Sequence, residues 1–291
     1  MCGIFGFSKS TPLTMAMTAP LALMMNTRGN DSWGVTDGDY IYKDNMSILD
    51  SFVEMGLEAP AYHTRGASVG AVTERNAHPF RVETDAKVVI GLHNGHVANH
   101  AELARKYNRK QIEVDSEHIF YHLAEDRSLR DIGGWGNVVW WEFPTGKPEQ
   151  RKRYFARFGG TTNLHFAKMV SGEIVFASTE DAVRVAAQLC GGTVKFFYKT
   201  RANMKYSISP KHGLLVHEDM EWGKDWVEPK VVTHYKGGGG HGGFTGNRYA
   251  FGTNSDIADL CAMTGCIRRI GPNDLVCEDC LDKLRVEMVA V

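Results

Sequence analysis

Short apolar segments recur along the first 228 residues and are separated by polar turns. These segments are rich in β-branched and aromatic side chains, a composition typical of β-strands. Glycine pairs at 133–134 and 159–160 indicate turns or bulges beside them. The pattern predicts strands at Lys87–Leu92, Asn137–Phe143, Glu173–Ala177 and Val194–Tyr198.

Apolar residues at helical spacing occur between these segments. The spacing predicts helices over Leu13–Met25, Glu117–Glu125 and Thr179–Leu189. Asp115 and Ser116 precede the second helix and are expected to cap its N-terminus. Helices interleaved with short strands, without an internal repeat, indicate a mixed α and β domain.

A glycine run separates this region from the end of the chain. Six of the seven residues from 237 to 243 are glycine, and such a segment cannot bury a core. We interpret it as a flexible linker; the alternative, an anion-binding loop, lacks the Lys-Ser/Thr pair of a phosphate site. The chain therefore divides into a domain at 2–228, a linker at 229–247 and a small module at 248–291.

Composition and charge narrow the class of protein. Apolar residues make up 43% of the chain and charged residues 23%, as in ordinary globular proteins. The formal net charge of −1 gives no sign of a general polyanion binder. No apolar run is long enough to span a bilayer, and Lys9 interrupts the short apolar start. Six cysteines in a chain this long do not suggest a disulfide scaffold, so we expect a cytoplasmic protein without a membrane partner.

The candidate chemistry begins at Cys2. Met1 precedes so small a residue that its removal is expected, which leaves Cys2 with a free α-amine and a thiol. Reference pKa values are about 7.7–8.0 for the amine and about 8.5 for the thiol, so the amine can take the thiol proton near neutral pH. One residue would then supply nucleophile and base together. Taken alone, the pattern is equally that of an accidental cysteine.

Five short polar motifs follow Cys2, and each adjoins a predicted strand or helix end. Loops at such ends commonly carry functional residues. In chain order the motifs are RGNDSWG at 28–34, HTRGAS at 63–68, NAHPF at 76–80, HNGHVAN at 93–99 and DSE at 115–117.

The order and content of these motifs, behind the Met-Cys-Gly start, resemble the glutaminase domain of class II glutamine amidotransferases, the N-terminal-nucleophile (Ntn) family. The resemblance covers roughly residues 2–228. It implies a four-layer α/β/β/α sandwich of α+β class, with Cys2 at the end of the first strand between two antiparallel sheets. It also implies glutaminase chemistry that needs neither a metal nor another cofactor.

The resemblance further implies a role for each matching residue. Asn94 and Gly95 correspond to the oxyanion hole, where the Asn94 amide and the Gly95 N–H stabilise the tetrahedral oxyanion. Arg65 would bind the α-carboxylate of glutamine, because a planar guanidinium suits a bidentate contact, and Asp115 would bind the α-ammonium group. Arg28 is placed with the substrate-binding residues and is expected to help position the nucleophile.

Several motif residues have a second interpretation. Arg28 and Asp31 could instead form a structural ion pair beneath the site. His63, His78 and His93 are expected to orient or pack rather than carry protons, because the α-amine already serves as base; they lie on separate motifs, which disfavours a metal site.

Two further features concern the rim of the site. His96 and His100 are expected to be surface histidines, since nothing else in their segment supports a metal site. Gly66 stands where the family often has a bulky aromatic residue that helps to cover bound glutamine. A glycine at this position bears on how tightly the active site closes.

Four of the six cysteines lie in the C-terminal module. Two close pairs of thiols suit the tetrahedral coordination of structural zinc, and so small a module needs a stabilising centre. Reduced thiols or a redox pair are the alternatives. Arg268 and Arg269 between the pairs could contact nucleic acid or an acidic partner, or form a solvated turn. The expected Zn²⁺ ligands are Cys261, Cys266, Cys277 and Cys280.

The sequence therefore predicts an enzyme that hydrolyses glutamine to glutamate and ammonia through a Cys2 thioester. Amidotransferases usually join this activity to a synthase, but the chain contains neither an SGGxDS adenylation loop nor a Walker A motif. We expect a separate ammonia-accepting synthase as partner. The alternatives are a stand-alone γ-glutamyl amide hydrolase and a non-enzymatic binding or scaffold protein. The acceptor is left open, as is formation of a homo-oligomer.

Overall fold

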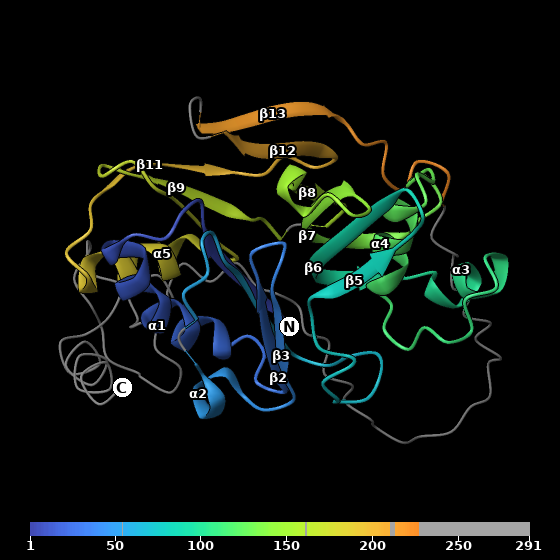
Figure 1. Cartoon of the computed structure of the whole chain (residues 1–291), viewed down its shortest axis with the longest axis horizontal. Helices are drawn as coiled ribbons and strands as arrows, with labels where there is room; N and C mark the ends of the chain where they lie inside the picture. Colours follow the sequence, from blue (N-terminus) through green and yellow to red (C-terminus); the bar gives the residue numbers. More distant parts are fainter. Residues whose placement is uncertain (54, 161, 210–212, 227–291) are drawn as a thin grey trace, which may run out of the picture.

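The strands of the chain, seen in a computed structural model, form two sheets that pack face to face (Figure 1). The structure describes residues 1–226 except 54, 161 and 210–212. Within this part the first sheet has seven strands and the second has six. Neighbouring strands are antiparallel in both sheets, which confirms the two antiparallel sheets expected.

The seven-stranded sheet has β1 in its interior. All five residues of β1 are buried, because helices cover one face of this sheet and the second sheet covers the other. The strand order is β11 (Val194–Lys199), β9 (His165–Met169), β10 (Ile174–Ala177), β1 (Gly3–Phe7), β4 (Ala61–Arg65), β2 (Ser32–Thr36) and β3 (Ile41–Asp44).

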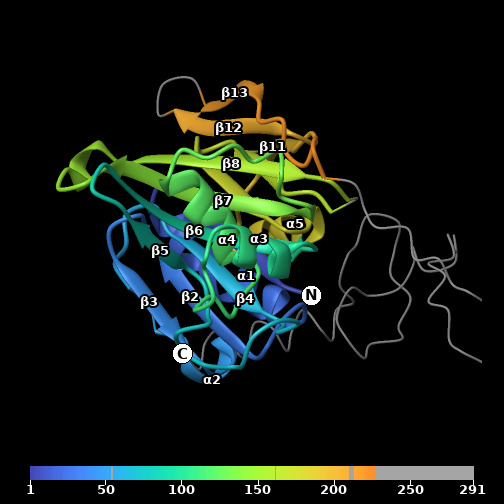
Figure 2. The same ribbon diagram turned by 90° about the vertical axis from the view of Figure 1, so that its right-hand side faces the viewer.

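The six-stranded sheet is built around its two longest strands, β6 and β7, which pair along eleven residues each. In both views β12 and β13 lie beside β11 along one edge of the sandwich (Figure 1, Figure 2). The strand order is β13 (Gly213–Asp219), β12 (Met204–Ser209), β8 (Lys152–Phe158), β7 (Gly134–Pro144), β6 (Lys87–Val97) and β5 (Phe80–Glu83).

Helices form the two outer layers. Residues of α1 and α5 bury one face of the seven-stranded sheet, whereas α4 buries the outer face of the six-stranded sheet. Figure 1 shows α1 and α5 on one side of the sheets and α4 on the other. The helices are α1 (Pro12–Asn26), α2 (Ile48–Ser51), α3 (His100–Lys106), α4 (Glu117–Ala124) and α5 (Glu180–Leu189), with a 3₁₀ turn η1 (Pro148–Gln150).

The three largest apolar clusters among the described residues separate these layers. The middle cluster lies between the two sheets and joins Ile4 of β1 to Leu92 of β6 and Phe155 of β8. One outer cluster packs Met17 and other α1 and α5 residues on the first sheet, and the other packs Phe120 of α4 on the second. The layers therefore run α/β/β/α, as the sequence predicted.

All seven predicted strands and helices are present. Strand β6 is longer than predicted and continues from Leu92 to Val97, because β7 pairs with it through the polar motif. No helix in the described part of the chain is long and apolar enough to cross a membrane. The linker at 229–247 and the module at 248–291 lie outside the described residues.

Candidate active site

Cys2 lies directly before β1, between the flanking strands β4 and β10. Arg28 Nε donates a hydrogen bond of 3.0 Å to the Cys2 carbonyl oxygen, and the Cys2 thiol lies 3.8 Å from the Gly66 carbonyl oxygen. Asp31 does not pair with Arg28; its carboxylate accepts from the Ala67 N–H at 2.7 Å. The Arg28 side chain thus contacts the backbone of Cys2 itself.

Burial sets the protonation of the Cys2 thiol. Desolvation raises its pKa above the ordinary value and outweighs the opposing effects of the Gly66 hydrogen bond, the terminal amine and Arg65; Asp115 raises it slightly further. The thiol is therefore largely protonated at neutral pH, and a nucleophilic role requires a base beside it. The charges of Arg65 and Asp115 both act on the thiol, in opposite directions.

Asn94 and Gly95 lie on β6, opposite Asn137 and Gly136 of β7. A Cβ on Gly95 would lie 2.1 Å from the Trp135 carbonyl oxygen and 2.5 Å from Gly136 Cα, so only glycine fits this close strand pairing. The Asn94 side chain is buried and its amide nitrogen donates to Ser178 Oγ at 3.2 Å.

Ser178 connects the two sheets at this point. Its hydroxyl oxygen accepts from the Ile4 N–H at 2.9 Å as well as from Asn94, and its own N–H donates to the Ile4 carbonyl oxygen at 2.8 Å. The Asn94 amide is thereby fixed relative to the backbone two residues after Cys2. The sequence analysis missed Ser178; its position between a predicted strand and a predicted helix was the available signal.

Arg65 ends β4 and is 2% exposed. Its guanidinium group donates to three carbonyl oxygens of the following loop, those of Val69 at 2.7 Å, Ala71 at 3.1 Å and Gly70 at 3.3 Å. Carbonyl oxygens carry only a partial negative charge. A fully anionic group would therefore bind the Arg65 guanidinium more strongly than these carbonyls do.

Asp115 is 5% exposed and lies two residues before α4, where it contacts the last residue of β6. Its carboxylate accepts from the Val97 N–H at 2.7 Å and lies 3.2 Å from His96 Nδ1. The His96 side chain is 38% exposed, as expected of a surface histidine, and its ring also contacts the carboxylate of Asp115.

The predicted capping of α4 is also wrong. Ser116 occupies the N-cap position but makes no side-chain capping bond, because its backbone is helical rather than extended. Its hydroxyl instead contacts His93 Nδ1 at 2.8 Å, and the Asp115 carboxylate is directed to Val97. Both side chains are held by β6 rather than by the helix.

Gly66 lies against the N-terminal residue. A Cβ on Gly66 would come within 2.9 Å of the Met1 nitrogen and 3.1 Å of the Met1 carbonyl oxygen. A larger side chain would therefore displace Met1 from its present position. Removal of Met1 would open this space beside Cys2.

His63 on β4, His78 before β5 and His93 on β6 are all buried. The rings of His63 and His78 are 4.0 Å apart, and His63 Nε2 lies 3.0 Å from the His93 carbonyl oxygen. Burial lowers the pKa of His63 to about 3 and that of His93 to about 4, and lowers the pKa of His78 well below its ordinary value. All three imidazoles are therefore neutral at physiological pH.

These histidines predict acid sensitivity. The folded state keeps them neutral, so the unfolded chain binds more protons once the pH falls below about 6.5. Their stabilising contribution is complete above that pH and is lost toward pH 4, by up to about 1.4 kcal/mol per pH unit for each histidine. Denaturant unfolding at pH 7, 6 and 5 measures this loss. His78→Leu should reduce the dependence of the unfolding free energy on pH by the contribution of one histidine. A free energy of unfolding that stays constant from pH 7 to 5 would contradict the conclusion that these histidines are buried in the neutral form.

The predicted zinc ligands Cys261, Cys266, Cys277 and Cys280 lie outside the described residues. Within the described part of the chain, no group of three or more His, Cys, Asp or Glu side chains is arranged to hold a metal ion. The two cysteines described there, Cys2 and Cys190, are both free thiols.

Comparison with known proteins identifies glutamine-using enzymes as homologues. The chain is 33% identical over 140 residues to the glutamine–fructose-6-phosphate aminotransferase of Gluconobacter oxydans, covering 43% of this chain and 22% of that protein. It is 37% identical over 142 residues to the enzyme of the same name from Streptococcus pneumoniae strain R6, covering 44% and 23%. The chain thus spans about a fifth of the length of these relatives. No protein-family model matches it.

Solved structures agree on the fold. A glutamine phosphoribosylpyrophosphate amidotransferase from B. subtilis aligns with a TM-score of 0.50 at 18% identity, covering 74% of this chain and 49% of that one. An allosteric regulatory enzyme of purine biosynthesis also gives 0.50, at 17% identity, covering 74% and 48%. The described domain therefore shares its fold with amidotransferase structures.

Proposed function

We propose that this protein hydrolyses the side-chain amide of glutamine and delivers the ammonia to an acceptor enzyme. The observation that carries the proposal is the Ser178 connection, which holds the buried Asn94 amide beside the backbone that follows Cys2. A thiol with an oxyanion donor fixed next to it is suited to acyl transfer. The names of the relatives agree with glutamine as the nitrogen donor.

The reaction would begin after removal of Met1. The α-amine of Cys2 takes the thiol proton, and the sulfur attacks the side-chain carbonyl carbon of glutamine. The resulting oxyanion accepts hydrogen bonds from the Asn94 amide and the Gly95 N–H. Collapse breaks the C–N bond, and the leaving nitrogen takes the proton from the Cys2 ammonium group. Water, deprotonated by the same amine, then hydrolyses the thioester to glutamate.

Arg65 and Asp115 would select free glutamine through its charged α-groups. The substrate carboxylate would replace one or more of the loop carbonyls that now contact the Arg65 guanidinium. Asp115 would contact the α-ammonium group while keeping its bond from Val97. The opposite charges of Arg65 and Asp115, which both act on the Cys2 thiol, match the two charged groups of a zwitterion.

Changes at these two residues should impair substrate capture. Arg65→Lys and Asp115→Asn are expected to raise KM for glutamine roughly tenfold to a hundredfold, because lysine cannot make the bidentate contact and asparagine carries no charge. Steady-state kinetics of ammonia release measures KM and kcat separately. Arg75→Ala is the matched control, since Arg75 is an exposed arginine of the same region whose partner is Glu113. A normal KM in either site variant would refute the substrate-binding roles.

The proposed acceptor is a separate synthase. A stand-alone γ-glutamyl hydrolase is the competing function, and the two differ in what stimulates them. If a synthase is the partner, adding the proteins that co-purify with this chain should increase its release of ammonia from glutamine. Full activity of the isolated chain on a larger γ-glutamyl compound, with no stimulation, would favour the competing function.

We also retain the proposal of one structural zinc ion on Cys261, Cys266, Cys277 and Cys280. A chain ending at Lys236 should lose the metal and keep glutamine hydrolysis unchanged, because all the proposed catalytic residues precede that point. Elemental analysis and ammonia release measure the two effects on the same preparations. Absence of zinc in the metal-replete full chain would refute the site, and loss of activity on truncation would refute its independence.

A further inference from the structure

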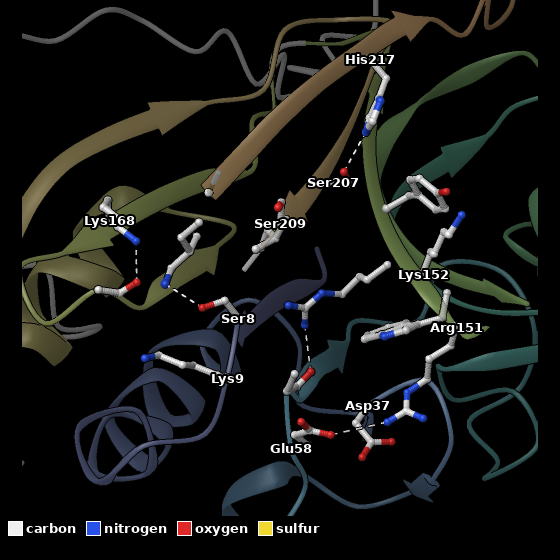
Figure 3. A pocket seen from close by; sticks show the side chains of 18 residues that line it. Ser8, Lys9, Asp37, Glu58, Arg151, Lys152, Lys168, Ser207, Ser209 and His217 are labelled. Atoms are coloured by element: carbon white, nitrogen blue, oxygen red, sulfur yellow. Dashed lines mark hydrogen bonds and ion pairs between the residues drawn. The ribbon is translucent and has the colours of Figure 1, made fainter. Parts of the chain in front are cut away.

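A cavity of about 790 Å³ opens at the other end of β1 from Cys2 (Figure 3). Ser8 and Lys9, which line it, directly follow the last residue of β1. Six residues of extended chain from Cys2 to Ser8 span roughly 20 Å. None of the proposed glutaminase residues lines this cavity, so it is a separate place on the molecule.

Arg153 of β8 lies in the wall of this cavity. Its guanidinium carbon lies 5.5 Å from the ring centre of Trp141 and 5.4 Å from those of Phe155 and Phe176. Nη1 donates to the Ala59 carbonyl oxygen at 2.8 Å. Within the described residues no carboxylate pairs with this cation, and burial lowers its pKa to about 9. A guanidinium has five N–H donors, and the bond to Ala59 uses one of them.

Positive side chains predominate around Arg153. In Figure 3, Lys168 lies on one side of the cavity and Lys152 on the opposite side. Five Lys and Arg side chains line the cavity against two carboxylates, Asp37 and Glu58. Neither carboxylate contacts Arg153: Asp37 accepts two backbone N–H groups, and Glu58 lies 3.7 Å from Arg151.

We propose that this cavity binds a small phosphorylated compound, with a phosphate group on the fork of Arg153 and the surrounding lysines balancing its further charge. The cavity lining has three more positive than negative side chains. A phosphate dianion or pyrophosphate balances this charge better than a single carboxylate does, because it carries more negative charge. The ring stack holds the guanidinium in place before the ligand arrives, which lowers the entropic cost of binding. The cavity volume is in the range of small-molecule sites.

Calorimetric titration of the full chain with inorganic pyrophosphate, at physiological ionic strength, tests this directly. One saturable site per chain is expected. Arg153→Gln should weaken binding by roughly tenfold or more, and Lys152→Gln by about threefold to tenfold, because each removes a charged contact. Lys110→Gln is the matched control: it removes the same charge from an exposed lysine outside the cavity and should leave affinity unchanged.

Arg153 packs against three rings, so the fold of Arg153→Gln is checked by circular dichroism. Should that chain fail to fold, Lys9→Gln with Lys152→Gln tests the same cavity and should abolish measurable binding. The proposal is overturned if pyrophosphate shows no saturable binding, if Lys110→Gln weakens binding as much as Lys152→Gln, or if citrate binds more tightly than pyrophosphate. Because the readout is binding alone, these outcomes are independent of whether the chain hydrolyses glutamine.

Discussion

Cys2→Ala is expected to abolish ammonia release from glutamine, lowering the rate by roughly 10⁴-fold or more, because no other group can form the thioester. Glutamine binding should be largely retained, since Arg65 and Asp115 remain in place. Ammonia release and calorimetric binding of glutamine on the same preparation separate the two effects.

Cys190→Ala is the matched control for this experiment. Cys190 is the other free cysteine among the described residues and lies at the C-cap of α5, away from the proposed site. Its variant should keep full activity. Substantial activity in Cys2→Ala, or an equal loss in Cys190→Ala, would contradict the assignment of the nucleophile.

Asn94→Ala should lower kcat by roughly 10²–10³ while changing KM little, because an oxyanion-hole donor acts mainly in the transition state. Ser178→Ala should produce a smaller loss, about fivefold to tenfold, since the amide stays present but loses the hydrogen bond that orients it. Full kinetic profiles of both variants measure this graded effect.

Asn137→Ala controls for disturbance of the sheet. Asn137 lies directly opposite Asn94 in β7 and is equally buried, yet it is assigned no contact with substrate. Its variant should keep most of the wild-type kcat. A loss as large as that of Asn94→Ala would mean that the strand pair, not the Asn94 amide, accounts for the effect.

The sequence predicted the elements of the fold better than their extents. Strand β6 was expected to end at Leu92 because the apolar pattern stops there. Pairing with β7 carries it five residues further, through Asn94 and Gly95, and this pairing is a tertiary effect with no local signal. The layer order came from the family resemblance, since periodicity does not specify which sheet a strand joins.

In the candidate site, too, local sequence patterns predicted the residues but not the contacts between distant segments. The motifs identified Arg65 and Asp115; the structure buries both, and the charge of each affects the Cys2 thiol. Ser178 was missed because its contact with Asn94 joins segments far apart in the chain, and the contact of His96 with Asp115 went unforeseen for the same reason. The capping prediction for Ser116 used only local spacing, and the contact with His93 replaced it.

The most direct measurement of the central claim is peptide mass mapping of active protein treated with an electrophilic chloroketone analogue of glutamine. We predict an N-terminal peptide that begins at Cys2 and carries one analogue on its sulfur, with activity lost in proportion to labelling. Retention of Met1 in protein that releases ammonia at the full rate, or inactivation while Cys2 stays unlabelled, would contradict the account.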